Sequence, residues 1–122
     1  MAITNYRRGA DFERAVRADL VEHGYEVIRS AGSKTKVDLV AIKTGELLLI
    51  QCKLAAGRLP SGEWNRLRAL SRMCDARPVV ARKVDGVVQP YYMELLADAP
   101  EGRKRDAGVC WQPWSPDPLG ER

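Results

Sequence analysis

The spacing of apolar residues predicts a helix followed by a short strand at the start of the chain. Three large apolar residues recur at every fourth position: Phe12, Val16 and Leu20. This is the period of one helix face, and Gly24 follows as a typical helix stop. We therefore expect a helix over Asp11–His23 and a strand over Tyr25–Arg29.

Two apolar segments on either side of Thr44-Gly45 predict a hairpin at the centre of the sheet. We expect its strands over Val37–Lys43 and Glu46–Lys53. Apolar residues occupy both alternate sets of positions in these strands, so both faces of the hairpin should be buried. Strands that are buried on both faces are typical of a sheet with helices on its two sides.

The second half of the chain predicts a helix, two strands and a tail. The helix is expected over Glu63–Asp75, and its apolar stripe consists of Trp64, Leu67, Leu70, Ser71 and Cys74. Strands are expected at 78–84 and 87–93, around an Asp85-Gly86 pair that is typical of a tight hairpin. We expect one domain over residues 1–110 and a loosely ordered, proline-containing tail over residues 111–122.

Composition narrows the class of protein. A chain of 122 residues favours a single domain, and its net charge of +4 favours a polyanionic partner. One histidine and three widely spaced cysteines argue against a disulfide framework and a Cys/His zinc site, so any metal should be a hard cation held by oxygen. No apolar run reaches about 18 residues and no signal-peptide pattern is seen, so we expect no membrane partner and a cytoplasmic, intracellular or nucleoid-associated protein.

Polar residues interrupt the hairpin at its open end. With Thr44-Gly45 as a two-residue turn, Asp38 lies opposite Gln51, and directly opposite residues share one face of an antiparallel pair. Lys53 lies two residues beyond Gln51 and therefore shares that face. Cys52 points the other way and is expected in the core.

This cluster has two interpretations that spacing alone leaves open. In the structural one, Asp38 and Lys53 form an ion pair that caps the sheet edge. In the functional one, the cluster is a hydrolytic metal site, in which Asp38, Gln51 and the Cys52 backbone carbonyl supply oxygen ligands. Lys53 would then stabilise an attacking water or a phosphate.

The segment from Tyr6 to Lys53, with its "RSAGS", "VDLVA" and final lysine, closely resembles the archaeal-type Holliday junction resolvases. These belong to the PD-(D/E)XK nuclease superfamily. The resemblance implies an α/β fold with a restriction-endonuclease-like αβββαβ core, in which helices flank a central mixed sheet. One position departs from the family motif, because Gln51 stands where the family usually has glutamate. Gln-x-Lys versions also occur in the superfamily, and they include Mrr-like nucleases.

The resemblance also implies roles for single residues. Asp38 matches the metal-binding aspartate, Lys53 the catalytic lysine, and Glu13 the first acidic residue at the metal site. Ser33 matches a serine that assists catalysis in some relatives. Basic residues form an expected DNA-binding rim, which consists of Arg7, Arg8, Arg14, Arg29, Lys34 and Lys36.

The predicted function is a metal-dependent endonuclease that cuts four-way DNA junctions as a homodimer. The expected cofactor is Mg²⁺, which Mn²⁺ should replace, and the metal ligands are Glu13, Asp38, Gln51 and the Cys52 carbonyl. The dimer interface is expected on the second helix or around Tyr91 and Tyr92. Two alternatives stay open: a nuclease-fold DNA-binding module that has lost cleavage, and an Mrr-like or structure-selective nuclease.

Overall fold

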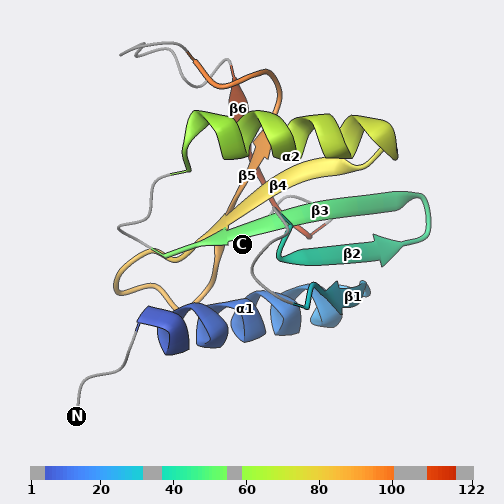
Figure 1. The fold of residues 1–122 in the computed structure, drawn as a ribbon. Helices are drawn as coiled ribbons and strands as arrows, with labels where there is room; N and C mark the ends of the chain where they lie inside the picture. Colours follow the sequence, from blue (N-terminus) through green and yellow to red (C-terminus); the bar gives the residue numbers. More distant parts are fainter. Residues whose placement is uncertain (1–4, 32–36, 55–58, 101–109, 118–122) are drawn as a thin grey trace.

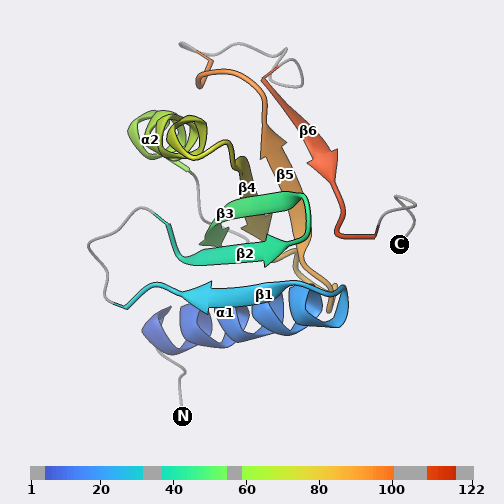
Figure 2. The same cartoon turned by 90° about the vertical axis from the view of Figure 1, so that its right-hand side faces the viewer.

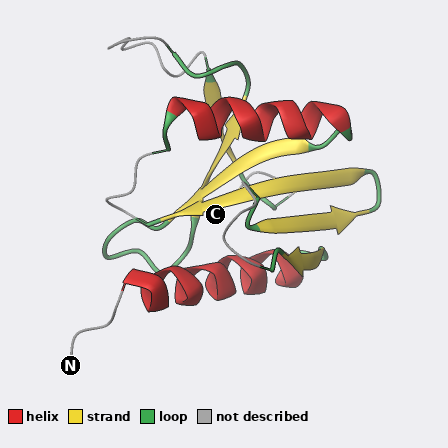
Figure 3. Ribbon diagram, viewed as in Figure 1, coloured by secondary structure: helices red, strands yellow, loops and turns green. Residues whose placement is uncertain are grey.

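The computed structural model describes residues 5–31, 37–54, 59–100 and 110–117, which form one mixed sheet and two helices (Figures 1 and 3). The elements in chain order are α1 (Asn5–Glu22), β1 (Glu26–Arg29), β2 (Leu39–Lys43), β3 (Glu46–Lys53), α2 (Ser61–Met73), β4 (Arg77–Arg82), β5 (Tyr91–Leu95) and β6 (Trp111–Trp114). The strands lie side by side in the same order, and only β3 and β4 pair in parallel. The predicted α/β fold with a central mixed sheet is confirmed.

The two helices cover opposite faces of the sheet (Figures 1 and 2). The core beneath α1 includes Phe12, Val16 and Leu20, the three residues of its predicted apolar face. The core beneath α2 includes Trp64 and Leu67. Helix α1 begins six residues before the predicted start, because residues 5–10 (NYRRGA) contain no apolar period that could mark a helix in the sequence. Neither of the described helices has the length and apolar character needed to cross a membrane.

The β2–β3 hairpin has the register that the sequence predicts. Lys43 pairs with Glu46 and Val40 with Leu49, and Gly45 takes a φ of 76° in the turn, where residues other than glycine are strained. Alternate residues face the two helices, as expected from their apolar pattern. Ile42 nevertheless is 42% exposed, because α2 packs over β3 and β4 and leaves this end of β2 uncovered.

Helix α2 is the crossover between the parallel strands β3 and β4. Two parallel neighbouring strands need a crossover connection, and here that connection begins at the end of β3. Trp64, Leu67 and Ser71 are buried on the predicted stripe. The prediction for Cys74 is wrong: the helix ends at Met73, so Cys74 falls outside its buried face and is exposed.

The connection between β4 and β5 is longer than the predicted two-residue hairpin. Arg82 pairs with Tyr91, so that residues 83–90 form the loop. The Asp85-Gly86 pair does form a local turn, in which the Val87 N–H donates to the Val84 carbonyl at 3.0 Å. The strands do not continue up to this turn because Pro90, which has no N–H, cannot donate to the ladder.

The prediction of a loosely ordered tail is wrong for Trp111–Trp114. These residues form strand β6, which pairs with β5 on the edge of the sheet. Edge strands tolerate proline, so Pro113 does not prevent pairing. Two perpendicular ring contacts fix the strand, Tyr91 with Trp111 at 6.5 Å and Tyr92 with Trp114 at 5.4 Å between ring centres. Residues 118–122 lie outside the described part of the chain.

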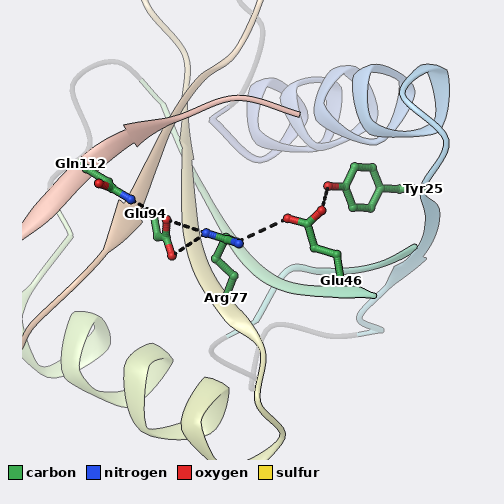
Figure 4. Close-up of polar contacts among 5 residues, drawn as sticks. All are labelled: Tyr25, Glu46, Arg77, Glu94 and Gln112. Atoms are coloured by element: carbon green, nitrogen blue, oxygen red, sulfur yellow. Dashed lines mark hydrogen bonds and ion pairs between the residues drawn. The ribbon is translucent and has the colours of Figure 1, made fainter. Parts of the chain in front are cut away.

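A chain of polar contacts ties four strands together at the end of the sheet where β3 and β4 begin (Figure 4). Arg77 donates to Glu94 at 2.9 Å, and its Nε lies 3.3 Å from Glu46. Glu46 accepts a hydrogen bond from the Tyr25 hydroxyl at 2.7 Å, and Glu94 accepts one from Gln112 at 2.9 Å. The network therefore links the segment before β1 to β3, β4, β5 and β6.

We predict that Arg77→Gln lowers the free energy of unfolding by about 2 kcal/mol, because it leaves two carboxylates without their shared cation. Arg72→Gln is the matched control, since Arg72 lies exposed in the last turn of α2 and should change stability by less than about 0.5 kcal/mol. Urea titration of both variants measures the difference. Equal losses in the two variants would contradict a stabilising role for the network.

Candidate active site

Asp38 lies at the open end of the β2–β3 hairpin and is held there by two backbone contacts. Its own N–H donates to the Ile50 carbonyl at 2.8 Å, and its Oδ2 accepts a hydrogen bond from the Cys52 N–H at 2.7 Å. The ladder between the strands ends at Leu39 and Ile50, so Asp38 lies opposite Gln51, one step beyond. The hairpin therefore places Asp38 opposite Gln51, as the sequence predicted. It also fixes the carboxylate against the backbone of Cys52.

Lys53 ends β3 and pairs with an acid that the sequence analysis did not select. Its Nζ lies 3.5 Å from Glu63 Oε1, in the first turn of α2. The two side chains are 21% and 25% exposed, so the pair is accessible from solvent. The alternative Asp38–Lys53 ion pair is not among the ion pairs of the described residues.

Glu13 reaches the same region from α1. It is 23% exposed and forms an ion pair with Arg29 at 3.0 Å. Arg29 pairs with Leu39 across β1 and β2, so Glu13 is tied to the end of the hairpin that carries Asp38. The charge of Glu13 contributes to raising the pKa of both the Asp38 carboxyl and the Cys52 thiol. Asp38 and Lys53 thus lie at the same end of the hairpin, Glu63 lies beside Lys53, and Glu13 is joined to the end of β1 through Arg29.

The Asp38 carboxyl lies in an unfavourable electrostatic environment. Burial raises its pKa above the ordinary value, the Cys52 N–H and the Lys53 ammonium lower it, and the charges of Glu13 and Glu63 raise it. The net effect is a raised pKa, because two neighbouring acids and burial outweigh one lysine and one hydrogen bond. A bound cation would relieve this excess of negative charge.

Gln51 supplies a neutral oxygen beside these charges. Its side chain is only 8% exposed. Cys52 packs into the core beneath α1, as expected, so that only its backbone faces the cluster. All three cysteines are free thiols.

The donor set fits a hard divalent cation in its chemistry. Carboxylate and amide oxygens are the ligands that such a cation prefers. Within the described ranges, however, no three His, Cys, Asp or Glu side chains are arranged to hold a metal by themselves. The neutral Gln51 and Cys52 oxygens, water or a phosphate would therefore have to complete the coordination of a bound ion.

The predicted basic rim is only partly covered by the structure. Arg7, Arg8 and Arg14 are exposed on the first half of α1, and Arg14 pairs with Asp11. Arg29 is bound to Glu13 and so lies beside the acidic cluster. Ser33, Lys34 and Lys36 lie outside the described residues.

Sequence reasoning missed Glu63, although a signal for it existed. A parallel β3–β4 pair requires a crossover helix, and the first turn of that helix lies near the end of the first strand. The residues at such an edge commonly form the binding site of an α/β sheet. An acid in the first turn of α2 was therefore a candidate neighbour for Lys53.

Comparisons with known proteins give a family. The sequence model of the archaeal Holliday junction resolvase (Hjc) family matches residues 4–104. The chain is 37% identical over 84 residues to the crossover junction endodeoxyribonuclease Hjc of Methanocaldococcus jannaschii, a match that covers 66% of this chain and 62% of that protein. It therefore aligns with less than two thirds of that relative's length.

A solved structure agrees with this assignment. The chain resembles Archaeoglobus fulgidus Hjc, described as a Holliday junction resolvase from an archaeal hyperthermophile, with a TM-score of 0.62 and 27% sequence identity. The similarity covers 70% of each chain. Together with a family match that extends over most of the sequence, this likeness shows that the chain belongs to the archaeal Holliday junction resolvase family.

Proposed function

We propose that this protein is a metal-dependent endonuclease that resolves four-way DNA junctions by hydrolysing phosphodiester bonds. The observation that carries the proposal is the half-buried Asp38 carboxylate, fixed by the Cys52 N–H at 2.7 Å at the strand end that carries Lys53. The family supports the choice of substrate, since the relatives from Methanocaldococcus jannaschii and Archaeoglobus fulgidus are named as a crossover junction endodeoxyribonuclease and a Holliday junction resolvase. Such a substrate places the protein wherever the DNA is, inside the cell.

In this proposal, Glu13, Asp38, Gln51 and the Cys52 carbonyl would hold Mg²⁺, which Mn²⁺ should replace. When bound, such an ion would supply positive charge to the scissile phosphate and lower the pKa of a bound water. The hydrogen bond from the Cys52 N–H pre-positions the Asp38 carboxylate for this role. Lys53 supplies a second cation for the charge that develops on the phosphate.

Recognition of the junction rests on backbone charge and DNA shape. Arg7, Arg8 and Arg14 expose guanidinium groups along one helix, a geometry suited to phosphates. Ser33 stays a prediction from the family resemblance, and Lys34 and Lys36 stay predicted members of the basic rim. Contacts of this kind bind DNA without reading the bases.

A second copy of the chain completes the proposal, because paired cuts across a junction follow naturally from a two-fold dimer. The proposed interface is an apolar groove of about 530 Å³ beside Tyr91 and Tyr92. The β4–β5 loop and β6 form its other walls, and Val87 on that loop is 47% exposed. Exposed apolar surface of this kind is typical of a protein interface.

The alternative from another class is a DNA-binding module that has lost cleavage, and Gln51 is the observation that favours it. A neutral amide in place of the motif glutamate weakens the attraction for a cation. Incubation with a four-way junction, a flap and a duplex, each with Mg²⁺, Mn²⁺ or EDTA, separates the candidates. Binding without cleavage in every metal would favour the module, and preferred cleavage of flap or duplex would favour an Mrr-like or structure-selective nuclease.

We predict that Asp38→Asn abolishes junction cleavage and leaves junction binding intact or tighter, because it removes a negative charge near DNA. Lys53→Ala should also abolish cleavage. Asp75→Asn is the matched control: Asp75 is exposed beyond the far end of α2, and its φ of 53° suits asparagine. Single-turnover cleavage and thermal melts are measured together, and an Asp38→Asn protein that cuts like the parent would refute the assignment.

We predict that junction binding weakens steeply with salt and tolerates changes of sequence. Arg8→Gln and Arg14→Gln should each lower the slope of log affinity against log salt by about 0.9, the value for one lost phosphate contact. Arg72→Gln, on the other helix, should leave the slope unchanged. Fluorescence anisotropy from low to high salt measures these slopes, and a parent affinity that hardly responds to salt would exclude the basic rim.

We predict that the protein sediments as a dimer at micromolar concentration. Val87→Asp should weaken dimerisation at least tenfold, or by about 1.4 kcal/mol, because it places a charge at the apolar groove. Met73→Asp tests the other candidate surface, since Met73 is 82% exposed at the end of α2. A protein that remains monomeric even with junction DNA would contradict the dimer, and dissociation by Met73→Asp alone would move the interface to α2.

A further inference from the structure

Arg82 lies beside Lys53 on the neighbouring strand of the sheet. The two residues are register partners in the parallel pair of β3 and β4, and both strands end at the same edge of the molecule (Figure 1). The Lys83 N–H donates to the Lys53 carbonyl at 3.0 Å, so the pairing continues beyond Arg82. Neighbouring strands lie about 4.8 Å apart, and the backbone therefore fixes Arg82 close to Lys53.

The side chains of Arg82 and Lys53 leave the sheet on the same face. Val80, two residues before Arg82, packs in the core beneath α2, and Ala81 packs in the core beneath α1. Side chains alternate along a strand, so Arg82 shares the α2 face with Val80. Lys53 is on this face too, because its ammonium lies 3.5 Å from Glu63 on α2. Two basic residues of different strands therefore share one face at one edge of the sheet.

The charge of Lys53 alone is a weak attraction for a DNA strand at this edge. Glu63 already offsets part of that charge from 3.5 Å away. The Asp38 carboxylate lies at the same end of the β2–β3 hairpin. A phosphate that approaches Lys53 is therefore also repelled by carboxylates, and a second cation on the same face would offset this repulsion.

The position and chemistry of Arg82 suit it to bind a phosphate. It is half-buried at the end of a central strand, between its partners Lys53 on β3 and Tyr91 on β5. Partial burial limits the rotamers of a long side chain, so less freedom is lost when a ligand binds. The planar guanidinium can donate two parallel hydrogen bonds to one phosphate, which a lysine ammonium cannot do.

Two roles that involve no ligand compete with phosphate binding. The charge of Arg82 could simply keep the edge of the sheet soluble, and its aliphatic stem could cover apolar surface. These roles predict changes in solubility or folding stability when Arg82 is replaced. Neither predicts that the effect of the replacement depends on one particular phosphate of the DNA.

We propose that Arg82 binds the phosphate next to the scissile one, on the DNA strand that Lys53 contacts. This inference rests on the proposed nuclease function and adds to it a DNA-binding residue outside the predicted basic rim. The ends of β3 and β4 then hold consecutive phosphates of one strand, the scissile phosphate at Lys53 and its neighbour at Arg82.

The test combines a change in the protein with a change in one phosphate. Four-way junctions carry a single neutral methylphosphonate, placed in turn at each position around the branch point, and fluorescence anisotropy in EDTA measures binding. At one position the methylphosphonate should weaken binding by the parent about tenfold, and Arg82→Gln should weaken binding of the unmodified junction by a similar factor. The two changes together should weaken binding no more than either alone, because both remove the same contact.

Two further variants serve as controls, and thermal melts confirm that each protein is folded. Arg72→Gln, in the exposed last turn of α2, should bind every junction like the parent. Arg82→Lys keeps the charge and loses the planar fork, so it should bind the unmodified junction more tightly than Arg82→Gln. If Arg82→Gln does not fold, Arg82→Lys carries the test, since the same methylphosphonate should weaken its binding less than it weakens binding by the parent.

Two binding results would overturn the inference. The first is an Arg82→Gln protein that is folded and binds the unmodified junction like the parent. The second is a pair of losses that multiply at every methylphosphonate position, because Arg82 then contacts none of those phosphates.

Cleavage of the unmodified junction by the parent, in Mg²⁺ or Mn²⁺, separates this inference from the proposed function. A parent that cuts next to the phosphate coupled to Arg82 would support both. A parent that cuts elsewhere, or shows no coupled phosphate, would refute the role of Arg82 and support the nuclease. A parent that shows a coupled phosphate but never cuts would refute the nuclease and support phosphate binding by Arg82, and a parent that does not bind the junction would refute both.

Discussion

The parallel pairing of β3 with β4 is the constraint on which the rest of the molecule depends. Parallel neighbours cannot be joined by a tight turn, so the chain must cross over through α2. That crossover covers the second face of β3 and makes the central hairpin a buried element. It also brings the first turn of α2 to the strand end that carries Lys53, and so sets the composition of the candidate site.

The two ends of the sheet differ in how the charges of partly buried side chains are balanced. At one end, Arg77 lies between Glu46 and Glu94, and each carboxylate also accepts a hydrogen bond from a neutral donor. At the other end, Asp38 is half-buried, and desolvation together with the charges of Glu13 and Glu63 raises its pKa. Charges that are paired with opposite charges stabilise a fold, whereas unbalanced charge at an accessible edge is typical of functional sites.

Local patterns predicted the elements and the central register, and long-range contacts explain what they did not predict. The Thr44-Gly45 turn fixes which residues pair across the hairpin, so Asp38 and Gln51 were placed opposite each other from sequence alone. Nothing local marks Trp111–Trp114 as a strand, because the segment contains a proline and gains its stability from β5. Glu63 likewise becomes a neighbour of Lys53 only once the direction of β4 is known. The roles of the site residues came from family resemblance, since spacing left an ion pair and a metal site equally open.

The edges of the sheet bear on how two copies of the chain can associate. The outermost strands, β1 and β6, are four residues long, and β6 contains Pro113, which has no N–H to offer a further strand. Short edges and proline are the features by which natural proteins discourage edge-to-edge pairing and aggregation. A continuous sheet through two subunits is therefore disfavoured, and contact between copies falls to side chains on loops and faces, where substitutions can tune its strength without altering the backbone ladder.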